Sequence, residues 1–417
     1  MKQTIVLLWG SARNSHHHER NGIKYLSKNF KLIHFNCLPL LNRNNSYSDF
    51  DSKNIASTIE ISSFDQLHRC LNTIKPDYAI DLIGPTREML KIDRILDNLS
   101  VKLIVQNIGP IQVPYRIEYW KYLLKCIFKK SAVKVNSGNL IKQKRSNLFT
   151  EVKIMILIRT LFVNFNAKIV RVKLSRIRPY AAIVVGTKGL NYYTKNAKFK
   201  IESPSYDYYR YQLLSKKLVT KYTKKDRKYI VFIDDNLTSG LDFELIKITE
   251  PIHDKPLYFT RLNLFFDYLE FLYGCPLIIS GHPSDKNRAQ YSSNFQGRTI
   301  VYDKTAELVS GSLLVVIQAS TAVSFAVQSM KTILSVTSNE LEDSFIGPQI
   351  RSLSKKVGST YINIDKFSPS SFKIQEINEK KYLRYLNEYI AISKFECKHP
   401  MEFLSALLTQ NNLLNYL

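Results

Sequence analysis

The stretch PLIISGHPSDKN, residues 276–287, contains an apolar run that ends abruptly at Gly281-His282-Pro283. A short apolar run bounded by glycine and proline predicts a buried β-strand followed by a tight turn. The turn would present the imidazole of His282 at the strand tip, where it can donate a hydrogen bond to a phosphate or act as an acid. A histidine-proline pair on its own is more often a purely structural turn.

Similar apolar runs recur along the chain and alternate with polar, helix-like segments. Strands that are nearly continuous in apolar residues, each followed by a helix, are typical of parallel sheets covered on both faces. We therefore predict an α/β fold, in which ligands collect at the carboxyl ends of the strands. The predicted strands are residues 5–9, 31–35, 78–83, 103–106 and 181–185 in the first half and 228–233, 277–280, 299–302, 313–317 and 332–336 in the second.

The length of the chain, 417 residues, is more than one hydrophobic core usually spans, so we expect two domains. A polar run at residues 220–227 has the composition of a linker. It separates a first Rossmann-like domain, residues 1–220, from a second, residues 228–380, and the two would face each other across a central cleft. Residues 381–417 are predicted to form C-terminal helices, because apolar and tyrosine side chains recur at three- and four-residue steps.

The chain is strongly basic, with 60 Lys and Arg residues against 35 Asp and Glu and a net charge of +25. Residues 121–178 hold fifteen of the basic residues and a single acid, Glu151, interleaved with short apolar runs. This pattern is compatible with basic amphipathic helices on an anionic membrane surface, or with a solvated basic face over an ordinary core. Because no nucleic-acid recognition motif accompanies the charge, we do not expect nucleic acid as a partner.

The composition also predicts a compartment. The sequence has no uninterrupted apolar run of about 18 residues and no secretory signal. Its five cysteines are scattered, without the spacing of a zinc site or of a disulfide framework. We therefore expect a cytoplasmic protein without a metal or a cofactor, and the basic segment would place it peripherally at a membrane surface.

A second candidate site follows the apolar run at residues 313–317. The segment Gln318-Ala319-Ser320-Thr321 places small hydroxyl residues at the start of a predicted helix, where they can cap the helix and leave backbone N–H groups directed at an anion. Each motif alone is weak. Together, about 38 residues apart and in this order, the His-Pro and Ser-Thr pairs are moderately specific.

These two motifs, in the second half of a two-domain α/β chain, resemble those of the bacterial CMP-sugar glycosyltransferases of GT-B fold, which include sialyltransferases, polysialyltransferases and Kdo transferases. The resemblance covers residues 228–337, including the segment 297–312 between the motifs. It implies a GT-B-like fold with two Rossmann-type domains. It also implies that the donor phosphate is held by His282, Ser320 and Thr321, with Pro283, Lys304 and Gln318 beside them.

The pair Asp234-Asp235, after the predicted strand 228–233, resembles the position of the covalent nucleophile in retaining β-Kdo transferases. A carboxylate there can attack the anomeric carbon as CMP leaves, and the acceptor hydroxyl then opens the glycosyl-enzyme. We take Asp234 as the nucleophile and Asp235 as the fallback, with a simple turn as the structural alternative. Asp81, near the end of the strand 78–83, is the candidate base if the reaction inverts configuration, as in the sialyltransferases.

The loop after the first strand is rich in histidine and arginine and would face the donor across the cleft. Arg13, His16, His17 and His18 are therefore candidates for binding the acceptor or an acidic sugar. Three adjacent histidines do not predict a metal site, because consecutive residues rarely converge on one ion.

The predicted function is transfer of Kdo or another ulosonic acid from a CMP donor to a lipid-linked glycan acceptor in lipopolysaccharide or capsule biosynthesis. Three alternatives stay open. They are an inverting, sialyltransferase-like enzyme, a transferase that uses a UDP- or GDP-hexose, and a non-catalytic membrane-docking partner of polysaccharide assembly.

Overall fold

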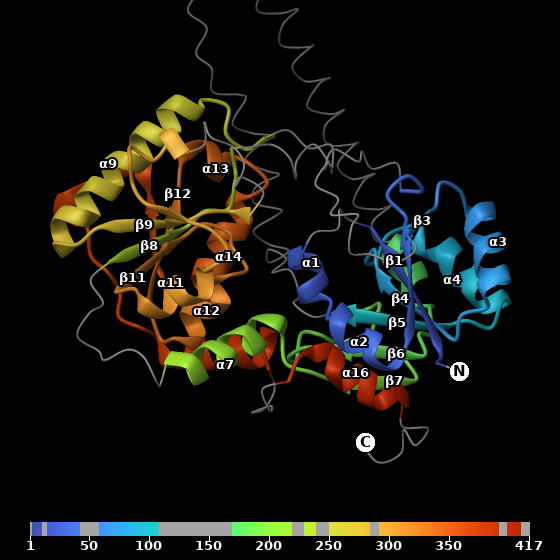
Figure 1. Ribbon diagram of the computed structural model, residues 1–417. Coiled ribbons are helices and arrows are strands. Elements are labelled where there is room, and N and C mark those ends of the chain that lie inside the picture. Colours follow the sequence, from blue (N-terminus) through green and yellow to red (C-terminus); the bar gives the residue numbers. More distant parts are fainter. Residues whose placement is uncertain are drawn as a thin grey trace, which may run out of the picture.

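The computed structural model describes residues 2–10, 15–41, 58–107, 169–218, 229–238, 250–283, 292–391 and 398–409. In these residues the chain forms two parallel β-sheets, each flanked by helices, which make up the two lobes of Figure 1. This is the two-domain α/β architecture that the sequence predicts.

The first sheet has seven strands in the order β3-β2-β1-β4-β5-β6-β7. The strand order reverses direction at β1, as in doubly wound Rossmann-like sheets. The strands are β1 (Thr4–Trp9), β2 (Lys31–Asn36), β3 (Thr58–Glu60), β4 (Tyr78–Leu82), β5 (Lys102–Asn107), β6 (Ala181–Val184) and β7 (Phe199–Glu202). The helices of this part are α1 (Ser15–Arg20), α2 (Ile23–Asn29), α3 (Phe64–Ile74) and α4 (Met89–Asn98).

The second sheet has six strands in the order β10-β9-β8-β11-β12-β13, and its strand order reverses in the same way at β8. The strands are β8 (Ile230–Ile233), β9 (Leu277–Ser280), β10 (Ile300–Val301), β11 (Leu314–Ile317), β12 (Thr332–Thr337) and β13 (Thr360–Asn363). The helices are α9 (Lys255–Tyr273), α11 (Thr305–Gly311), α12 (Val323–Gln328), α13 (Asn339–Asp343) and α14 (Gly347–Val357), and two short 3₁₀ turns cover Ile364–Lys366 and Pro369–Ser371.

All ten predicted strands are present, with ends within about two residues of the predicted ones. Three further strands, β3, β7 and β13, were not among them. Each lies at an edge of its sheet, and each carries exposed or half-exposed residues that interrupt the apolar run. An edge strand buries less of its surface than a central one, so its sequence lacks the continuous apolar signal.

Each sheet has a hydrophobic core on both faces. Along β1, Val6 and Leu8 belong to one core, while Ile5, Leu7 and Trp9 belong to the other. Successive side chains of a strand point to opposite faces, so an apolar run without alternation is what a sheet buried on both sides requires.

Three helices lie where the chain passes between the domains, and α7 and α16 are labelled in Figure 1. The helix α7 (Tyr206–Leu218) follows β7, yet its Leu214 is buried in a core of the second domain. The helix α15 (Glu379–Tyr389) packs in the same core. The helix α16 (Pro400–Thr409) returns to the first domain, where Met401, Leu404 and Leu408 are buried. The predicted C-terminal helices are therefore present, but they pack in different domains.

A close approach of backbones at Gly186 fixes one part of this junction. The residue has a φ of +61°, and a Cβ at this position would lie 2.4 Å from the carbonyl oxygen of Glu388 in α15. The next two amides, those of Thr187 and Lys188, donate hydrogen bonds of 3.0 Å to the carbonyls of Asn387 and Glu388. Only glycine fits here without displacing α15.

Two sequence predictions fall largely outside the described residues. The linker at residues 220–227 does so entirely, and of the basic segment 121–178 only residues 169–178 are described. The domain boundaries and the central cleft therefore stay predictions. In the part of the chain that is described, no helix combines the length and the apolar character needed to cross a bilayer.

Candidate active site

The candidate site lies at the carboxyl ends of three neighbouring strands of the second sheet. Strand β8 pairs with β9 on one side, aligning Ile233 with Ser280, and with β11 on the other, aligning Phe232 with Val316. Neighbouring strands are about 4.8 Å apart, so residues directly after these three strands share one edge of the sheet. The structure thus brings the predicted His-Pro, Asp-Asp and Ser-Thr motifs to the same edge.

The turn after β9 is shaped by a tight glycine. A Cβ on Gly281 would lie 2.5 Å from the ring of Tyr302 and 2.8 Å from the side chain of Ile300. The Gly281 amide donates a 3.0 Å hydrogen bond to the carbonyl of Val301. This contact with β10 and the residues after it fixes the strand end. The partly exposed His282 follows directly, and Pro283 is exposed.

Asp234 directly follows β8 and is buried, with 7% of its surface exposed. Its amide donates a 3.1 Å hydrogen bond to the carbonyl of Ser280. Its Oδ1 accepts a 3.0 Å hydrogen bond from the amide of Asn236, whose φ is +53°. Asp234 therefore shapes a turn, which is the structural alternative that the sequence left open, and its carboxylate remains at the strand edge beside Asp235.

Asp235 contacts the neighbouring strand end. Its Oδ2 accepts a 2.6 Å hydrogen bond from the amide of Ala319, and its carboxylate is also hydrogen-bonded to Ser320. Burial raises the pKa of Asp235 to about 7, against the lowering effect of these hydrogen bonds, and the nearby Asp234 adds to the rise. Sequence reasoning missed this contact. We expected the backbone N–H groups of this segment to be directed at a bound anion. The amide of Ala319 instead donates its hydrogen bond to Asp235.

Gln318 and Ser320 hold the segment after β11. The buried Gln318 donates a 2.8 Å hydrogen bond from Nε2 to the hydroxyl of Tyr258 in α9. Ser320 accepts a 3.3 Å hydrogen bond at Oγ from the amide of Ala322, whereas Thr321 is exposed. Gln318 thus anchors this segment to α9, while the two hydroxyl residues lie nearer the surface.

Lys304 and its neighbour Thr305 lie beside the same edge. Lys304 is exposed and precedes the first residue of α11. The hydroxyls of Thr305 and Ser280 are hydrogen-bonded at 2.8 Å, which ties α11 to the end of β9. This contact places the predicted lysine next to the strand that carries His282.

Asp81, the predicted base of an inverting reaction, is buried near the carboxyl end of β4 in the first sheet. Its Oδ1 accepts hydrogen bonds of 2.8 and 3.0 Å from the amides of Ile83 and Gly84, and its Oδ2 accepts one of 2.7 Å from the hydroxyl of Tyr193. Burial raises the pKa of Asp81, and these hydrogen bonds oppose the rise. Both carboxylate oxygens are engaged in holding a loop and a tyrosine.

The acceptor-side candidates are only partly described. Arg13 lies outside the described residues, and of His16 and His17 only the backbone, in α1, is described. The ring of His18 stacks on those of Trp9 and His34, with centroids 5.6 and 5.8 Å away. His18 therefore joins an aromatic cluster of the first domain, in which Trp9 Nε1 donates a 3.0 Å hydrogen bond to Nδ1 of His34.

His34 in this cluster is a residue that sequence reasoning missed. It is buried in β2, with 4% of its surface exposed. A polar residue between apolar neighbours was the available signal, but nothing in the sequence indicated that it would lie against Trp9 and His18.

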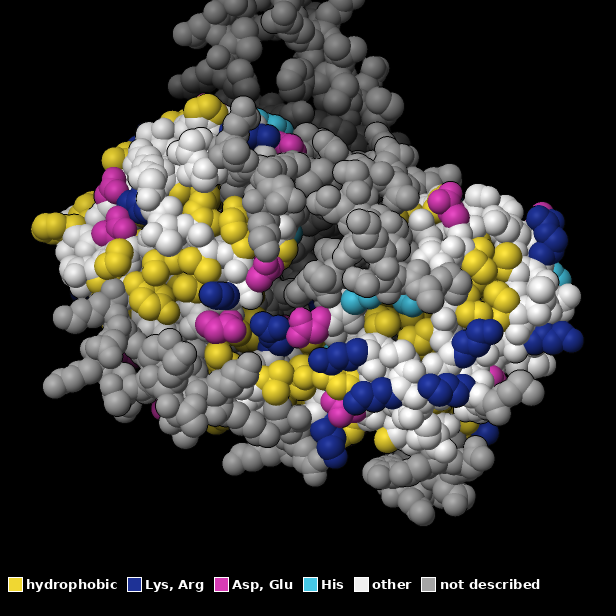
Figure 2. All heavy atoms as spheres, in the orientation of Figure 1, with side chains coloured by type: hydrophobic (Ala, Val, Ile, Leu, Met, Phe, Trp, Pro, Cys, Tyr) yellow, Lys and Arg dark blue, Asp and Glu magenta, His cyan; other side chains and the backbone are white. Residues whose placement is uncertain are grey.

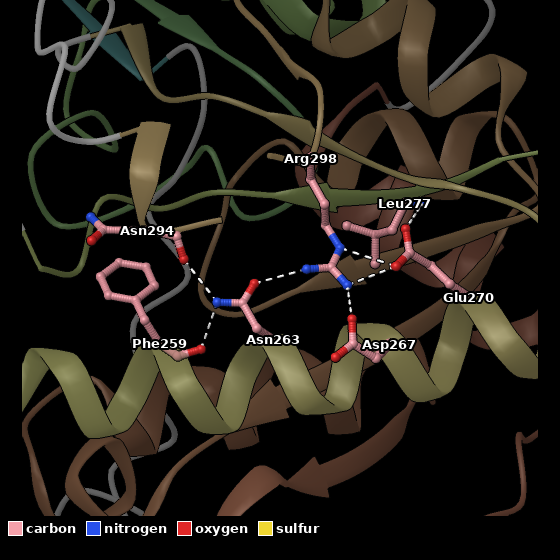
Figure 3. A network of polar contacts seen from close by, with 7 residues as sticks. All are labelled: Phe259, Asn263, Asp267, Glu270, Leu277, Asn294 and Arg298. Carbon is pink, nitrogen blue, oxygen red and sulfur yellow. Dashed lines mark hydrogen bonds and ion pairs between the residues drawn. The ribbon is translucent and has the colours of Figure 1, made fainter. Parts of the chain in front are cut away.

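A buried arginine organises the opposite edge of the second sheet (Figure 3). Arg298 donates hydrogen bonds to Asn263, Asp267 and Glu270 of α9, and its side chain is 8% exposed. Glu270 also accepts a 2.7 Å hydrogen bond from the amide of Leu277, the first residue of β9. Arg298 belongs to the segment 297–312 of the resemblance, but it lies at the amino ends of β9 and β10, away from His282.

Among the described residues, two cavities are lined by residues of the first domain. One of about 750 Å³ is lined by residues of the first domain that include Asp93, Lys102 and Tyr180. Another of about 650 Å³ is lined by residues that include Ser63, Lys91 and Arg94. Over the same described ranges, no three His, Cys, Asp or Glu side chains are grouped so that they could hold a metal ion.

The two parallel Rossmann-like sheets and the C-terminal helices make a GT-B-like fold, as the sequence predicted. No family model and no curated protein sequence matches the chain. Among solved structures, it is similar to the Methanocaldococcus jannaschii UDP-GlcNAc 2-epimerase in complex with UDP-GlcNAc and UDP, at 12% identity and a TM-score of 0.41, over 98% of this chain and 99% of that one.

A similar likeness is found to Acinetobacter baumannii MurG, at 8% identity and a TM-score of 0.41, over 98% of this chain and 95% of that one. The glycotransferase of kitacinnamycin matches at 10% identity and a TM-score of 0.43, over 97% of this chain and 93% of that one. These likenesses carry no residue roles, so the function is argued from the site itself.

Proposed function

We propose that this protein is a glycosyltransferase that uses a CMP-activated sugar, Kdo or another ulosonic acid, and a lipid-linked glycan acceptor. One observation carries the proposal. The strand ends that bear His282, Asp234-Asp235 and Ser320-Thr321 are neighbours at the carboxyl edge of the second sheet. Ligands of open α/β sheets bind at this edge.

The donor phosphate would lie between the two motifs. His282 and the hydroxyls of Ser320 and Thr321 supply hydrogen-bond donors for phosphate oxygens, and Lys304 supplies a positive charge nearby. These groups would stabilise the negative charge that develops on CMP as its bond to the sugar breaks. Because the phosphate would compete with Asp235 for the amide of Ala319, we expect donor binding to displace this carboxylate or to favour its protonated form.

The retaining route assigns separate roles to the two aspartates. The carboxylate of Asp234 attacks the anomeric carbon, and CMP departs with the electrons of the broken bond. The acceptor hydroxyl then attacks the same carbon, releases Asp234 and gives its proton to a base. Asp235 suits the role of base, because burial raises its pKa to about 7.

The inverting route is less well supported by the geometry. Its candidate base, Asp81, accepts hydrogen bonds at both carboxylate oxygens from Ile83, Gly84 and Tyr193. To act as a base, it would first have to give up one of these bonds.

Binding to the membrane is the remaining part of the proposal. The basic segment, residues 121–178, would dock on the anionic inner-membrane surface and bring the site to a lipid-linked acceptor. Each basic residue near such a surface contributes about 1 kcal/mol of binding free energy.

Release of CMP tests the proposed reaction. The purified protein is incubated with CMP-Kdo and, separately, with CMP-sialic acid, each with a crude glycolipid acceptor fraction, and free CMP is measured. We expect acceptor-dependent release of CMP from one of these donors. Release from UDP- or GDP-hexoses alone would contradict the CMP assignment and favour the hexosyltransferase alternative.

A further inference from the structure

The helix α7 presents one face to each domain. Its residues at positions 206, 209 and 210 face the first domain. The hydroxyl of Tyr209 lies 2.7 Å from that of Tyr25 in α2, and the rings of Tyr206 and Tyr209 contact His399, with centroids 5.7 and 5.2 Å away. These positions are three and four residues apart, which places them on one side of a helix.

The other face of α7 packs on the second domain. Leu214 is buried in its core, with Tyr208 and Tyr211 packed against the same cluster. Asp207, in the first turn of α7, accepts a hydrogen bond from the hydroxyl of Ser324 in α12. Spacings of three and four residues again define a single helix face, so α7 packs against both domains.

Arg210 connects α7 to the acceptor-side helix. Its Nη1 lies 3.1 Å from Oε1 of Glu19, and both side chains are partly exposed. Glu19 belongs to α1, the helix that carries His16, His17 and His18 and that lies between the two lobes in Figure 1. Burial lowers the pKa of Arg210, but Tyr206, Glu19 and Glu307 together raise it above its usual value. Glu307 belongs to α11, so Arg210 also interacts electrostatically with the second domain.

Asp207 connects α7 to the donor side. Its partner Ser324 is fully buried in α12 and lies three residues after Thr321. Burial raises the pKa of Asp207, against the lowering effect of the Ser324 hydroxyl, Arg20 and Arg210. Figure 2 shows acidic and basic side chains side by side at the base of the space between the two lobes.

We propose that Asp207 and Arg210 are positioning residues, through which α7 couples the predicted donor-binding segment before α12 to the predicted acceptor-side helix α1. The two residues are three positions apart on one rigid helix, so a shift of Ser324 is passed to Glu19 without a change in either domain's core. The assignment of a donor and an acceptor side rests on the proposed function, whereas the coupling of α12 to α1 through α7 does not.

Hydrogen exchange without any ligand tests the coupling. Ser324→Ala removes the hydroxyl that binds Asp207, and we expect the peptide covering residues 15–26 to exchange roughly threefold faster or more, although it lies in the other domain. Ser329→Ala is the matched control, because it removes a hydroxyl of the same segment that bonds to Ser310, 3.2 Å away. Unchanged exchange at residues 15–26 in Ser324→Ala would overturn the coupling.

A double variant distinguishes coupling from general loosening. Arg210→Gln breaks the contact with Glu19, and it should also accelerate exchange at residues 15–26. If both contacts belong to one connection, the double variant Ser324→Ala with Arg210→Gln exchanges no faster there than Arg210→Gln alone. Additive effects would mean two independent local contacts, and the proposal would then be wrong.

Addition of CMP separates this inference from the proposed function. In the native protein, saturating CMP should slow exchange at residues 318–324 and also at residues 15–26, and Ser324→Ala should lose only the second effect. If CMP slows exchange at residues 318–324 alone, the coupling is wrong and the donor site stands. If no nucleotide binds but the ligand-free effects are seen, the coupling stands and the proposed donor site is wrong.

Discussion

The carboxylate of Asp235, after β8, accepts a 2.6 Å hydrogen bond from the backbone amide of Ala319, after β11. The bond links two strand ends that were separate candidates in the sequence. It also places a half-buried acid, with a pKa raised to about 7 chiefly by desolvation, next to the hydroxyl pair Ser320-Thr321. An anion that binds at this segment therefore meets a carboxylate whose charge depends on pH.

The raised pKa of Asp235 predicts a pH-dependent stability. Between about pH 4 and 7 the folded protein holds this proton more tightly than the unfolded chain, so the free energy of unfolding falls as the pH rises. The slope from this group is at most about 1.4 kcal/mol per pH unit, because it binds or releases a single proton. Asp235→Asn keeps an oxygen that can accept from Ala319 and should remove this part of the slope.

Urea denaturation of both proteins measures that difference. Other titrating groups are common to the two proteins and cancel in the comparison. We expect Asp235→Asn to gain stability relative to the native protein as the pH rises from about 5 to about 8. Parallel pH profiles would show that Asp235 titrates normally.

The nucleophile assignment predicts a covalent adduct on Asp234. Incubation with CMP-Kdo without acceptor should yield a peptide that carries one ulosonic acid residue, detected by mass spectrometry. Asp234→Ala should lose about 100-fold or more in transfer, because the covalent route is removed. Asp235→Asn is the control, and it should still form the adduct. Transfer at the native rate by Asp234→Ala would remove the nucleophile role.

We expect Arg298 to stabilise the fold without affecting the binding of the donor nucleotide. Its guanidinium is buried against Asn263 and Glu270 at the edge opposite His282. Arg298→Ala leaves these groups without their partner and should lower the free energy of unfolding by about 3 kcal/mol. Arg384→Ala, which removes an exposed pair with Glu388, should cost less than about 1 kcal/mol. A weaker affinity of folded Arg298→Ala for nucleotide would instead tie this residue to the donor site.

The basic segment predicts binding to anionic vesicles. Glutamine at four of its lysines should weaken that binding, by about 1 kcal/mol for each residue near the surface. The lysines are Lys125, Lys129, Lys130 and Lys142, all outside the described residues. The control variant changes four exposed lysines of the first domain, Lys28, Lys75, Lys195 and Lys200. Equal vesicle binding by both variants would contradict membrane docking and would favour the alternative, a solvated basic face.

The strands could be predicted because burial on both faces leaves a continuous apolar run, as in β8 and β11. The alignment of His282 with Asp234 and Ser320 at one edge was also within reach, because ends of parallel strands share an edge. The order of the strands in each sheet could not be predicted. That β8 lies between β9 and β11 follows from pairing across many residues, and so does the bond from Ala319 to Asp235.

The junction between the domains was the least predictable part. The sequence indicated helices near the C-terminus, but nothing local showed that α15 packs in the second domain and α16 in the first. The two faces of α7 were hidden for a related reason. Tyrosine and polar side chains occur on all sides of this helix, so it lacks the single apolar face that marks a surface helix. Both of its faces pack against protein, and neither is left to water alone.

The central claim is that His282 and the Ser-Thr segment bind the phosphate of a cytidine nucleotide, and nucleotide-dependent melting tests it most directly. The protein and its His282→Ala variant are melted with CMP, CDP, UDP, GDP or ADP, since a ligand of the native state raises the melting temperature by mass action. We predict that CMP stabilises the native protein by a few degrees at about 100 times its Kd, and His282→Ala much less. Stabilisation by UDP or GDP but not CMP, or an equal effect of CMP on both proteins, would contradict the account.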